Sequence, residues 1–499
     1  MLPNRHATPA VSTVAAVVLA APTSFLVTWW LLRTPRALEL FGADPRPDRW
    51  HTSTTPAFGG IGIFAGLAVA VLAAIAIGPV GLPGELLAVL AGAAVVFAFG
   101  LLDDTVHLNP LAKLAAQVTA AVIVLQSSIS VEVVANPKLS WALGILWLVG
   151  LTNAFNLLDN MDGLAGSLAL VASACFALSA AFVTPNRDIF VVAAGLALAV
   201  AGFLPFNVRP SGPARAFMGD SGSQVLGFVL ASLGLMASYK EAGTTVATLV
   251  LPILILAIPI LDTALVTVMR LRSGRSVTQG GRDHTSHRLV YRGLSERRAV
   301  AFLVAVSAGL GLTSLAYSVL DSGRITAVGV LITSALLLQF AAFLSGAAAT
   351  PDESGLSART RLLVDTLVDG ALTVAALYAA YILLDNVTGT ENNRHVFIWA
   401  LPTVLFCRYL ALLGFGLYRV DRHNSRAGTV ARIVAAVAVS EAVAYVIVAG
   451  TLNMTGFPAS IFLADAVICS FLLVLGRFAE RAGLRVFRAW HRRRVMVPS

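Results

Sequence analysis

Long apolar segments alternate with short polar breaks along almost the whole chain. Most are about 20 residues long, which is the length an α-helix needs to cross the hydrocarbon core of a bilayer. Backbone groups in lipid must be satisfied within the spanning segment, so the pattern predicts an all-α fold, a polytopic membrane helix bundle. We expect about fifteen helices, near residues 11–32, 57–78, 86–102, 111–126, 139–158, 164–183, 189–207, 223–238, 245–269, 299–320, 325–346, 362–384, 396–418, 429–451 and 458–477.

Composition supports this fold class, since 57% of the 499 residues are hydrophobic and 12% are charged. We expect the first apolar run to be retained as a helix, because no clear small-residue cleavage site follows it. Cys175, Cys407 and Cys469 stand singly within apolar runs, which argues against both disulfides and a zinc site.

Basic residues predict the orientation of the bundle, because loops rich in Lys and Arg stay on the cytoplasmic side. With fifteen helices, most of the 35 Lys and Arg residues fall on one side, together with all the acidic motifs described below. We therefore expect the N-terminus outside the plasma membrane and the C-terminus and acidic motifs on its cytoplasmic side. The excess of Arg over Lys suggests that the protein comes from a bacterium. The net charge of +9 lies on these loops, where topology and anionic lipid explain it, so nucleic-acid binding is not expected.

Two adjacent carboxylates, Asp103 and Asp104, end one apolar run in the stretch GLLDDTVHLNP. Adjacent acids repel, and a divalent cation or a proton on one of them relieves the repulsion, which also suits a general base. For this pair taken alone, a solvated helix end is the alternative interpretation.

Amide and carboxylate side chains recur through NAFNLLDNMDGLAGS. Asn153, Asn156 and Asn160 are three and four apart, and Asp159 and Asp162 follow Asn156 at steps of three, so a helix would place them on one face. So dense a polar stripe in an apolar context indicates side chains that line an aqueous cavity.

The segment ARAFMGDSGSQVLG places Asp220 in a Gly-flanked turn before the next apolar run. One interpretation is that Asp220 and Ser221 cap the following helix. The other is that the helix N-terminus attracts a phosphate while Asp220 holds a hard cation through oxygen.

The longest basic loop contains His284 and His287 within DHTSHRL. No third soft ligand for zinc is nearby in sequence, so contact with phosphate or sugar is favoured, although the Arg residues also mark the inner membrane face. A smaller element, RWHTSTTPAFGG, pairs Arg49 and His51 with a Gly-Gly helix start.

Taken together and in this order, the motifs resemble those of the polyprenyl-phosphate N-acetylhexosamine-1-phosphate transferases (glycosyltransferase family 4), the superfamily that also holds phospho-N-acetylmuramoyl-pentapeptide transferase. The resemblance covers roughly residues 10–345 and rests on GLLDD, NAFNLLDNMDGLAG, FMGDSGS, the stretch around Asp262 and DHTSHRL. It implies transfer of a sugar 1-phosphate, GlcNAc-1-phosphate in particular, from a UDP-N-acetylhexosamine to polyprenyl phosphate, with release of UMP. This reaction would initiate cell-envelope glycan synthesis at the inner membrane face.

The same resemblance implies a role for each motif. Asp220 and Asn156 look like ligands of Mg²⁺, with Mn²⁺ as the alternative ion, and Asp103 and Asp104 look like acids that position or deprotonate the lipid phosphate. Asp159 looks like part of the wall around ribose and diphosphate. Asp162 and Phe217 look like contacts to uracil, and Arg49 and His51 look like contacts to the lipid phosphate. The catalytic His284 and His287, with Arg282 and Arg288, look like the loop around sugar and phosphates. Gly219 looks like a further substrate-binding residue.

The chain also departs from the family pattern. Ser53 stands where many members have Lys, and Ala57 stands where many have Arg. A basic contact to the lipid phosphate would then come from Arg49 or His51. Asn160 replaces a common Gly, and the longer His motif of the family is reduced to two His residues.

The resemblance divides the chain into a transferase domain of about eleven helices at residues 1–348, a linker at 349–360 and a four-helix extension with a basic tail at 361–499. The extension resembles, on scattered residues such as Asp365 and Asp369, the membrane part of nucleotide-sugar dehydratases and polyprenyl-phosphate hexose-1-phosphate transferases. We expect it to pack on a second copy or on a partner in envelope-glycan assembly.

Two other function classes compete with the enzyme. A transporter or flippase for lipid-linked sugar would also carry carboxylates in membrane helices, but transport sites lie near the midplane and these acids share one face. An inactive assembly scaffold is suggested by Ser53, Ala57 and the extension, and the intact acidic motifs argue against it.

Overall fold

The computed structural model describes most of the chain, and Arg49, His51 and Ser53 lie outside the described residues. Its described part is helical apart from two short paired strands, β1 (Gly42–Ala43) and β2 (Thr55–Pro56). Within the described residues, twelve helices are long and apolar enough to cross a membrane, which confirms the predicted all-α polytopic membrane bundle. The described ranges are 11–43, 55–77, 84–127, 129, 136–209, 212–240, 252–276, 281–320, 323–345, 358–388, 392–418, 426–451 and 459–495.

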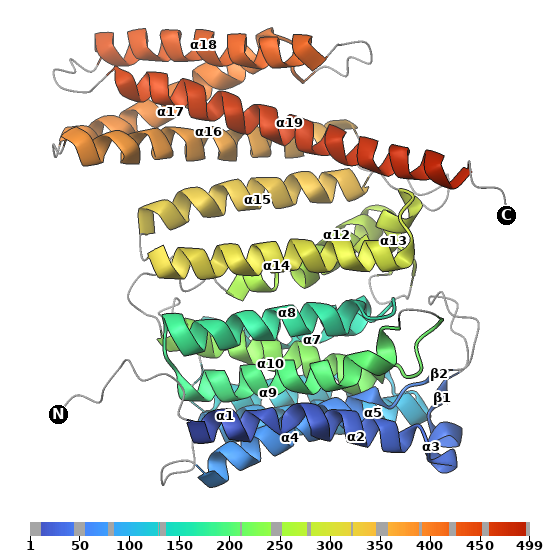
Figure 1. Ribbon diagram of the computed structural model, residues 1–499. Coiled ribbons are helices and arrows are strands. Elements are labelled where there is room, and N and C mark those ends of the chain that lie inside the picture. Colours follow the sequence, from blue (N-terminus) through green and yellow to red (C-terminus); the bar gives the residue numbers. More distant parts are fainter. Residues whose placement is uncertain are drawn as a thin grey trace, which may run out of the picture. The chain divides into compact units, whose positions relative to one another are not determined.

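Two compact units make up the structure, and the first, the N-terminal unit, comprises Met1–Val290 and Ser295–Leu320 (Figure 1). The helices for which the structure gives bounds in this unit are α1 (Val11–Val18), α2 (Ala20–Leu31), α3 (Pro35–Leu40), α4 (Gly59–Ile77), α5 (Gly84–Val106), α6 (Pro110–Leu125), α7 (Pro137–Leu158), α8 (Leu164–Leu178), α9 (Arg187–Asn207), α10 (Gly219–Lys240), α12 (Ala257–Arg272), α13 (Thr285–Tyr291) and α14 (Glu296–Leu320). A π-helical turn, Ser179–Val183, directly follows helix α8.

The C-terminal unit comprises Tyr291–Leu294 and Asp321–Ser499. In it α16 packs against α15, α17 and α19, and α18 packs against α17 and α19. The packing boundary therefore lies before α15, whereas the functional boundary at 349–360 stays a prediction. The helices of this unit are α15 (Gly323–Ser345), α16 (Ala358–Thr388), α17 (Asn392–Gly414), α18 (Arg426–Thr451) and α19 (Ser460–Val495).

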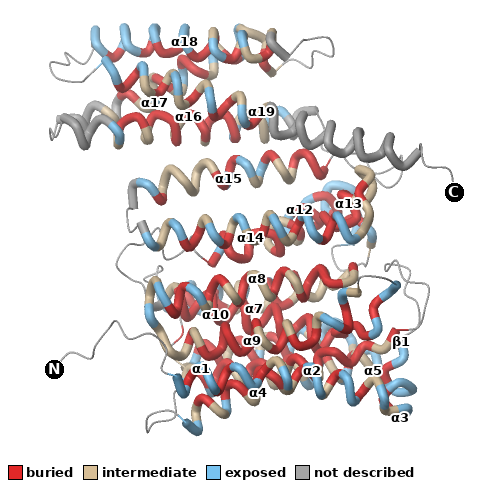
Figure 2. The backbone as a smooth tube through the Cα atoms, viewed as in Figure 1, coloured by how far each residue is buried: buried red, intermediate tan, exposed pale blue. Residues whose placement is uncertain are grey.

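Helix α10 is the central helix of the N-terminal unit. It packs against α4, α5, α7, α8 and α9. Within its span Gly219–Ser238, 94% of the most apolar 18-residue window is buried, and Figure 2 colours buried residues red. Gly60 of α4 explains one close approach, because a Cβ there would lie 2.3 Å from the backbone nitrogen of Gly222. The polar first turn of α10 is thus held inside the bundle by its neighbours.

Several helix ends differ from the sequence-based expectation. Helix α5 continues past the predicted end at 102, through both carboxylates, because His107 adopts a left-handed φ of 53° only beyond Val106. Helix α10 begins at Gly219, so Asp220 lies in its first turn and not in a preceding loop. Apolar runs mark the lipid-facing part of a helix, whereas backbone hydrogen bonds continue through polar residues at its ends.

Candidate active site

Asp104 caps the N-terminus of α10 from the end of α5. Its Oδ1 accepts a hydrogen bond from the Asp220 N–H at 2.7 Å, and its Oδ2 accepts from the Ser221 N–H at 3.1 Å and the Ser221 hydroxyl at 2.8 Å. The first N–H groups of a helix have no partner within it, and the helix dipole favours a negative charge there. Gly219 permits this approach, because its φ is 73° and a Cβ would lie 2.5 Å from Asp104 Oδ2.

Lys113 of α6 joins the two other carboxylates. Its Nζ contacts Asp103 Oδ2 and donates to Asp220 Oδ2 at 2.9 Å. Asp103 Oδ1 accepts from the Leu108 N–H at 2.6 Å, which holds the turn after α5. Asp103 and Asp220 are 3% and 8% exposed, so a cation between them offsets the cost of burying two charges. We name Asp103, Asp104, Lys113 and Asp220 the acidic centre.

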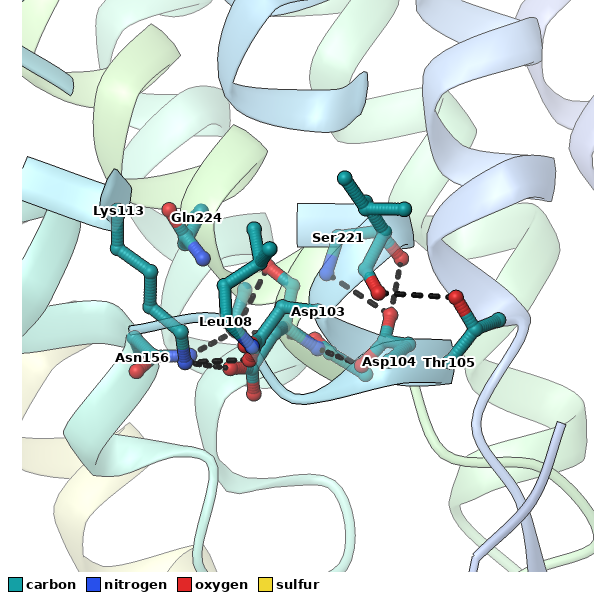
Figure 3. Close-up of polar contacts among 12 residues, drawn as sticks. Asp103, Asp104, Thr105, Leu108, Lys113, Asn156, Ser221 and Gln224 are labelled. Atoms are coloured by element: carbon teal, nitrogen blue, oxygen red, sulfur yellow. Dashed lines mark hydrogen bonds and ion pairs between the residues drawn. The ribbon is translucent and has the colours of Figure 1, made fainter. Parts of the chain in front are cut away.

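A layer of amides lies beside the acidic centre. Asn156 of α7 donates to the Ser223 hydroxyl of α10 at 3.0 Å, and Figure 3 shows its side chain next to that of Lys113. Gln117 of α6 donates to Gln224 at 3.1 Å and accepts from Asn153 at 2.8 Å. These bonds fix α6, α7 and α10 against one another.

The turn after α7 differs from the expected helical stripe. Helix α7 ends at Leu158, so Asp159, Asn160 and Asp162 lie in the following turn and only Asn153 and Asn156 share a helical face. At Asp159 the backbone leaves the helical conformation, with φ −74° and ψ 54°. In the turn that follows, Asp162 Oδ2 accepts from the Ala214 N–H at 3.0 Å, in the loop before α10.

Phe217 lies in that same loop, close to the start of α4. It forms a small apolar cluster with Ala57 and Ala214. Its N–H donates to the Pro56 carbonyl, and its own carbonyl accepts from the Gly59 N–H, both at 2.9 Å. The structure therefore brings Phe217 beside the segment that follows Arg49 and His51 in the sequence.

The His-bearing loop forms a second buried cluster. Asp262 of α12, which is 0% exposed, accepts from the Thr285 N–H at 2.6 Å and lies 2.7 Å from His284 Nδ1. Ser286 donates to Asn160 at 2.8 Å, which connects α13 to the turn after α7. In Figure 1, α13 lies at the same end of the N-terminal unit as β1 and β2.

Arginines support this loop in two ways. Arg270 of α12 forms a two-pronged ion pair with Asp283, with distances of 2.8 and 2.7 Å. Arg288 is buried and donates to the Asp283 carbonyl at 2.7 Å, whereas Arg282 is exposed. Burial opposes charge on Asp283, but the Arg270 guanidinium holds the pKa of this carboxyl below its usual range.

The two histidines differ in charge. Burial disfavours the charged ring of His284, but the Asp262 carboxylate raises the pKa of His284 above its ordinary value. Burial, assisted by the nearby charge of His284, lowers the pKa of His287 to about 4. At neutral pH the His287 ring is therefore neutral, whereas the Asp262 carboxylate favours a proton on His284, and the two ring centroids lie 6.3 Å apart.

A divalent cation is the cofactor that the motifs imply. No three His, Cys, Asp or Glu side chains in the described part of the chain are grouped to hold a metal ion. The donor chemistry nevertheless fits, because the carboxylates of Asp103 and Asp220 and the amide of Asn156 offer the oxygen ligands that Mg²⁺ prefers. The Lys113 ammonium already contacts both carboxylates as a cation, and the metal assignment stays a prediction.

Several of these residues were not singled out from the sequence. Lys113 and Gln117 are isolated polar residues four apart in an apolar run, which is the signal that would have placed both on one buried helical face. Ser223 and Gln224 follow Asp220 in the first turns of α10 without a distinctive pattern. Asp262 carried part of the family resemblance, but its pairing with the His loop required the structure.

Comparison with known proteins gives the same assignment. Residues 86–238 match the profile of glycosyl transferase family 4. The chain is 30% identical over 307 residues to the probable undecaprenyl-phosphate N-acetylglucosaminyl 1-phosphate transferase of Bacillus subtilis, covering 59% of this chain and 81% of that protein. It is 32% identical over 352 residues to the decaprenyl-phosphate N-acetylglucosaminephosphotransferase of Mycobacterium tuberculosis, covering 62% of this chain and 84% of that protein.

A shorter likeness extends to phospho-N-acetylmuramoyl-pentapeptide-transferase of Staphylococcus aureus, with 36% identity over 96 residues, 19% of this chain and 29% of that protein. The profile match at 86–238 contains the whole acidic centre and Asn156. The helices are those of a multi-pass membrane protein, the acidic centre lies inside the matched segment, and the relatives align over most of their length. The chain therefore belongs to glycosyl transferase family 4, the membrane family of polyprenyl-phosphate N-acetylhexosamine-1-phosphate transferases.

Proposed function

We propose that the protein transfers N-acetylhexosamine 1-phosphate, in particular GlcNAc-1-phosphate, from a UDP-sugar to polyprenyl phosphate and releases UMP. The observation that carries the proposal is the acidic centre, in which three carboxylates and one ammonium meet at the buried N-terminus of α10. The names of the relatives support the acceptor class and the sugar. The product would begin a cell-envelope glycan.

The chemistry is an exchange at phosphorus. An oxygen of the lipid phosphate attacks the phosphorus that bears the sugar, and the bond from that phosphorus to UMP breaks. Most of the catalytic effect in phosphoryl transfer comes from positioning and from stabilising negative charge. The acidic centre needs a cation to accept such a substrate, since carboxylates alone would repel it.

Mg²⁺ held by Asp220 and Asn156 would neutralise charge on the diphosphate and on the leaving phosphate. Lys113 already contacts Asp103 and Asp220, so its ammonium is placed to pair with a phosphate oxygen as well. We assign Asp103 as the base, because its Oδ2 contacts a side-chain ammonium that can also turn to the substrate phosphate, whereas both oxygens of Asp104 accept hydrogen bonds from the first turn of α10. In this assignment Asp104 positions the first turn of α10 and thereby Asp220.

The nucleotide and sugar would lie toward the His-bearing loop. A proton on His284 would be stabilised by Asp262, and the resulting positive charge would suit a diphosphate or a sugar oxygen. Asp162 joins the turn after α7 to Ala214 in the loop before α10, and Phe217 of that loop packs on the same Ala214. Through the bond from Ser286 to Asn160, the same turn also touches α13, so donor recognition and the His-bearing loop are connected.

We further propose that this end of the N-terminal unit faces the cytoplasm. Lys and Arg residues concentrate in the loops on that side, and UDP-sugars are made inside cells. The lipid phosphate would reach the acidic centre from the bilayer, because the ends of membrane-spanning helices lie at the bilayer interface.

UMP release tests the proposal. Purified full-length protein in lipid nanodiscs is given Mg²⁺, undecaprenyl phosphate and a panel of UDP-sugars, and UMP is measured. We expect release with UDP-GlcNAc, its loss in Asp220→Asn, and its retention in the matched control Asp369→Asn, which alters a carboxylate of the C-terminal unit. Folded protein that releases no UMP with any donor would overturn the proposal, and movement of lipid-linked sugar without UMP release would favour a flippase.

A further inference from the structure

The C-terminal unit contains a buried cluster of charged residues that the proposed reaction does not use. Arg408 of α17, Glu441 of α18 and Asp465 of α19 are 1%, 5% and 0% exposed. The Arg408 Nη2 donates to Glu441 Oε1 and, at 2.7 Å, to Asp465 Oδ2. Two carboxyl groups from different helices thus converge on one nitrogen. We name these three residues the Arg408 cluster.

Apolar side chains enclose the Arg408 cluster from both ends of the bundle. On each helix that contributes to it, the charged residue lies between members of one buried apolar cluster and members of another. Water is therefore kept from either side, and the membrane interior increases the cost of an unbalanced charge. The enclosing residues are Val404 and Leu412 on α17, Val437 and Ala444 on α18, and Phe462 and Cys469 on α19.

Charge counting shows one carboxylate in excess. The charged groups acting on Glu441 are Arg408 and Asp465, and those acting on Asp465 are Arg408 and Glu441. Among the described residues, the other titratable groups that act on the cluster are the thiols of Cys407 and Cys469, which carry no positive charge. From α16 the neighbour is Thr373, whose hydroxyl contacts Cys469 Sγ at 3.8 Å. If both carboxyl groups were ionised, the cluster would carry a net negative charge.

The outer atoms of the cluster find no compensation among the described residues. Arg408 Nε and Nη1, Glu441 Oε2 and Asp465 Oδ1 are all buried there without a hydrogen-bond partner. Glu441 Oε1 and Asp465 Oδ2 both accept from the same Arg408 nitrogen, so the two carboxyl groups lie next to each other. A hydrogen bond between two carboxyl groups requires that one of them carries a proton.

We propose that Glu441 is a proton-binding site in the membrane interior: it is protonated at neutral pH and donates to Asp465, which stays ionised beside Arg408. Glutamic acid is intrinsically the weaker acid of the two, so it keeps the single proton. The cluster is then neutral, and the ligand of the site is a proton exchanged with water. Buried intramembrane carboxyl groups of this kind serve proton-dependent steps in membrane proteins. The inference does not depend on the transferase activity.

The same unit provides a matched control. Asp369 of α16 and Arg477 of α19 form an ion pair at 2.6 Å, with Asp369 3% exposed. Within this pair one carboxylate meets one guanidinium, and the charge of Asp365 also acts on Arg477, so the pair itself is neutral without a bound proton. Asp369→Asn therefore changes a buried carboxylate of the same unit without removing a proton-binding group.

Infrared spectroscopy of the full-length protein in lipid at neutral pH tests the proposal. The carbonyl stretching band of a protonated carboxyl group is recorded with and without ¹³C-carboxyl-labelled glutamate. Glu441 is the buried glutamate of the described residues, so a band that shifts with this label reports on it. We expect a label-sensitive band in the unmodified protein and in Asp369→Asn, and its loss in Glu441→Gln.

Glutamine resembles a protonated glutamic acid in size and donor capacity, so Glu441→Gln should fold with a nearly unchanged melting temperature. Should this variant fail to fold, the labelled unmodified protein decides the question alone. The absence of any label-sensitive band there would overturn the proposal, as would a band that persists in folded Glu441→Gln.

Discussion

Replacing Asp104 by Asn separates a helix-capping role from a purely chemical one. The carboxylate accepts three hydrogen bonds at the start of α10, two from backbone N–H groups and one from the Ser221 hydroxyl. An amide has one accepting oxygen, and its NH₂ group would face the Ser221 N–H. The hydroxyl of Ser221 can rotate to accept from that NH₂, but one backbone N–H of α10 loses its partner.

The loss of folding stability in Asp104→Asn can be worked out from these contacts. An unsatisfied buried N–H costs about 1–3 kcal/mol, and loss of the negative charge at the helix N-terminus adds about 0.3–2 kcal/mol. We therefore expect Asp104→Asn to lower the free energy of unfolding by about 1–5 kcal/mol. Ser221→Ala removes one hydrogen bond and should cost about 1 kcal/mol.

The assay combines unfolding of purified protein in mixed micelles with UMP release from the same samples. We expect stability to fall in the order unmodified protein, Ser221→Ala, Asp104→Asn, and UMP release to fall in the same order, because the first turn of α10 also carries Asp220. In Asp103→Asn, UMP release should fall steeply with a changed pH profile. Unchanged stability of Asp104→Asn together with lost activity would refute the capping argument and make Asp104 the base.

The remaining predictions concern the metal, the topology, the extension and pH. Asp220→Asn should abolish turnover and weaken the response to added Mg²⁺, since a neutral amide is a poorer ligand, and near-normal activity would contradict the metal assignment. A cysteine at Ser273 should be shielded from an impermeant thiol reagent on intact cells while one at Lys138 reacts, with the buried native cysteines silent, and the reverse pattern would place the active site outside. A chain ending near Thr350 should still release UMP in vitro, because every site residue precedes it, and a stable but inactive truncation would assign the last four helices to the catalytic unit. The pKa of His287 is about 4 in the folded protein and about 6.5 in the unfolded chain. The stability that neutral His287 contributes is therefore complete above about pH 6.5 and is lost as the pH falls toward 4. In His287→Asn the melting temperature should depend less on pH across that range.

The sequence predicted the helices and the identity of most site residues because both have local signals. Apolar runs of spanning length indicate helices, and carboxylates such as Asp103 and Asp104 next to them stand out against lipid. The functional roles of these residues remain predictions, whereas their placement is now described. Asp103 and Asp220 meet through a contact that depends on how α5, α6 and α10 pack.

The contacts that the sequence did not reveal are long-range ones between single polar residues. Lys113 reaches Asp220 across more than a hundred residues of sequence, and Asp262 reaches His284 from the preceding helix. Helix ends were also missed, because hydropathy reports on the lipid-facing part of a helix and not on its caps. Asn160 was expected on a helical face and lies in a turn, where it accepts from Ser286.

The bond between the end of α5 and the start of α10 implies a division between fixed and adaptable parts of this site. Asp104 and Gly219 leave no space between these helix ends, and α10 is enclosed on nearly all sides. A change of substrate preference during evolution would therefore have to come from the turn after α7, the loop before α10 and the His-bearing loop. The phosphate end of the site would stay constant while these three loops diversify, so one helical frame can serve different sugars.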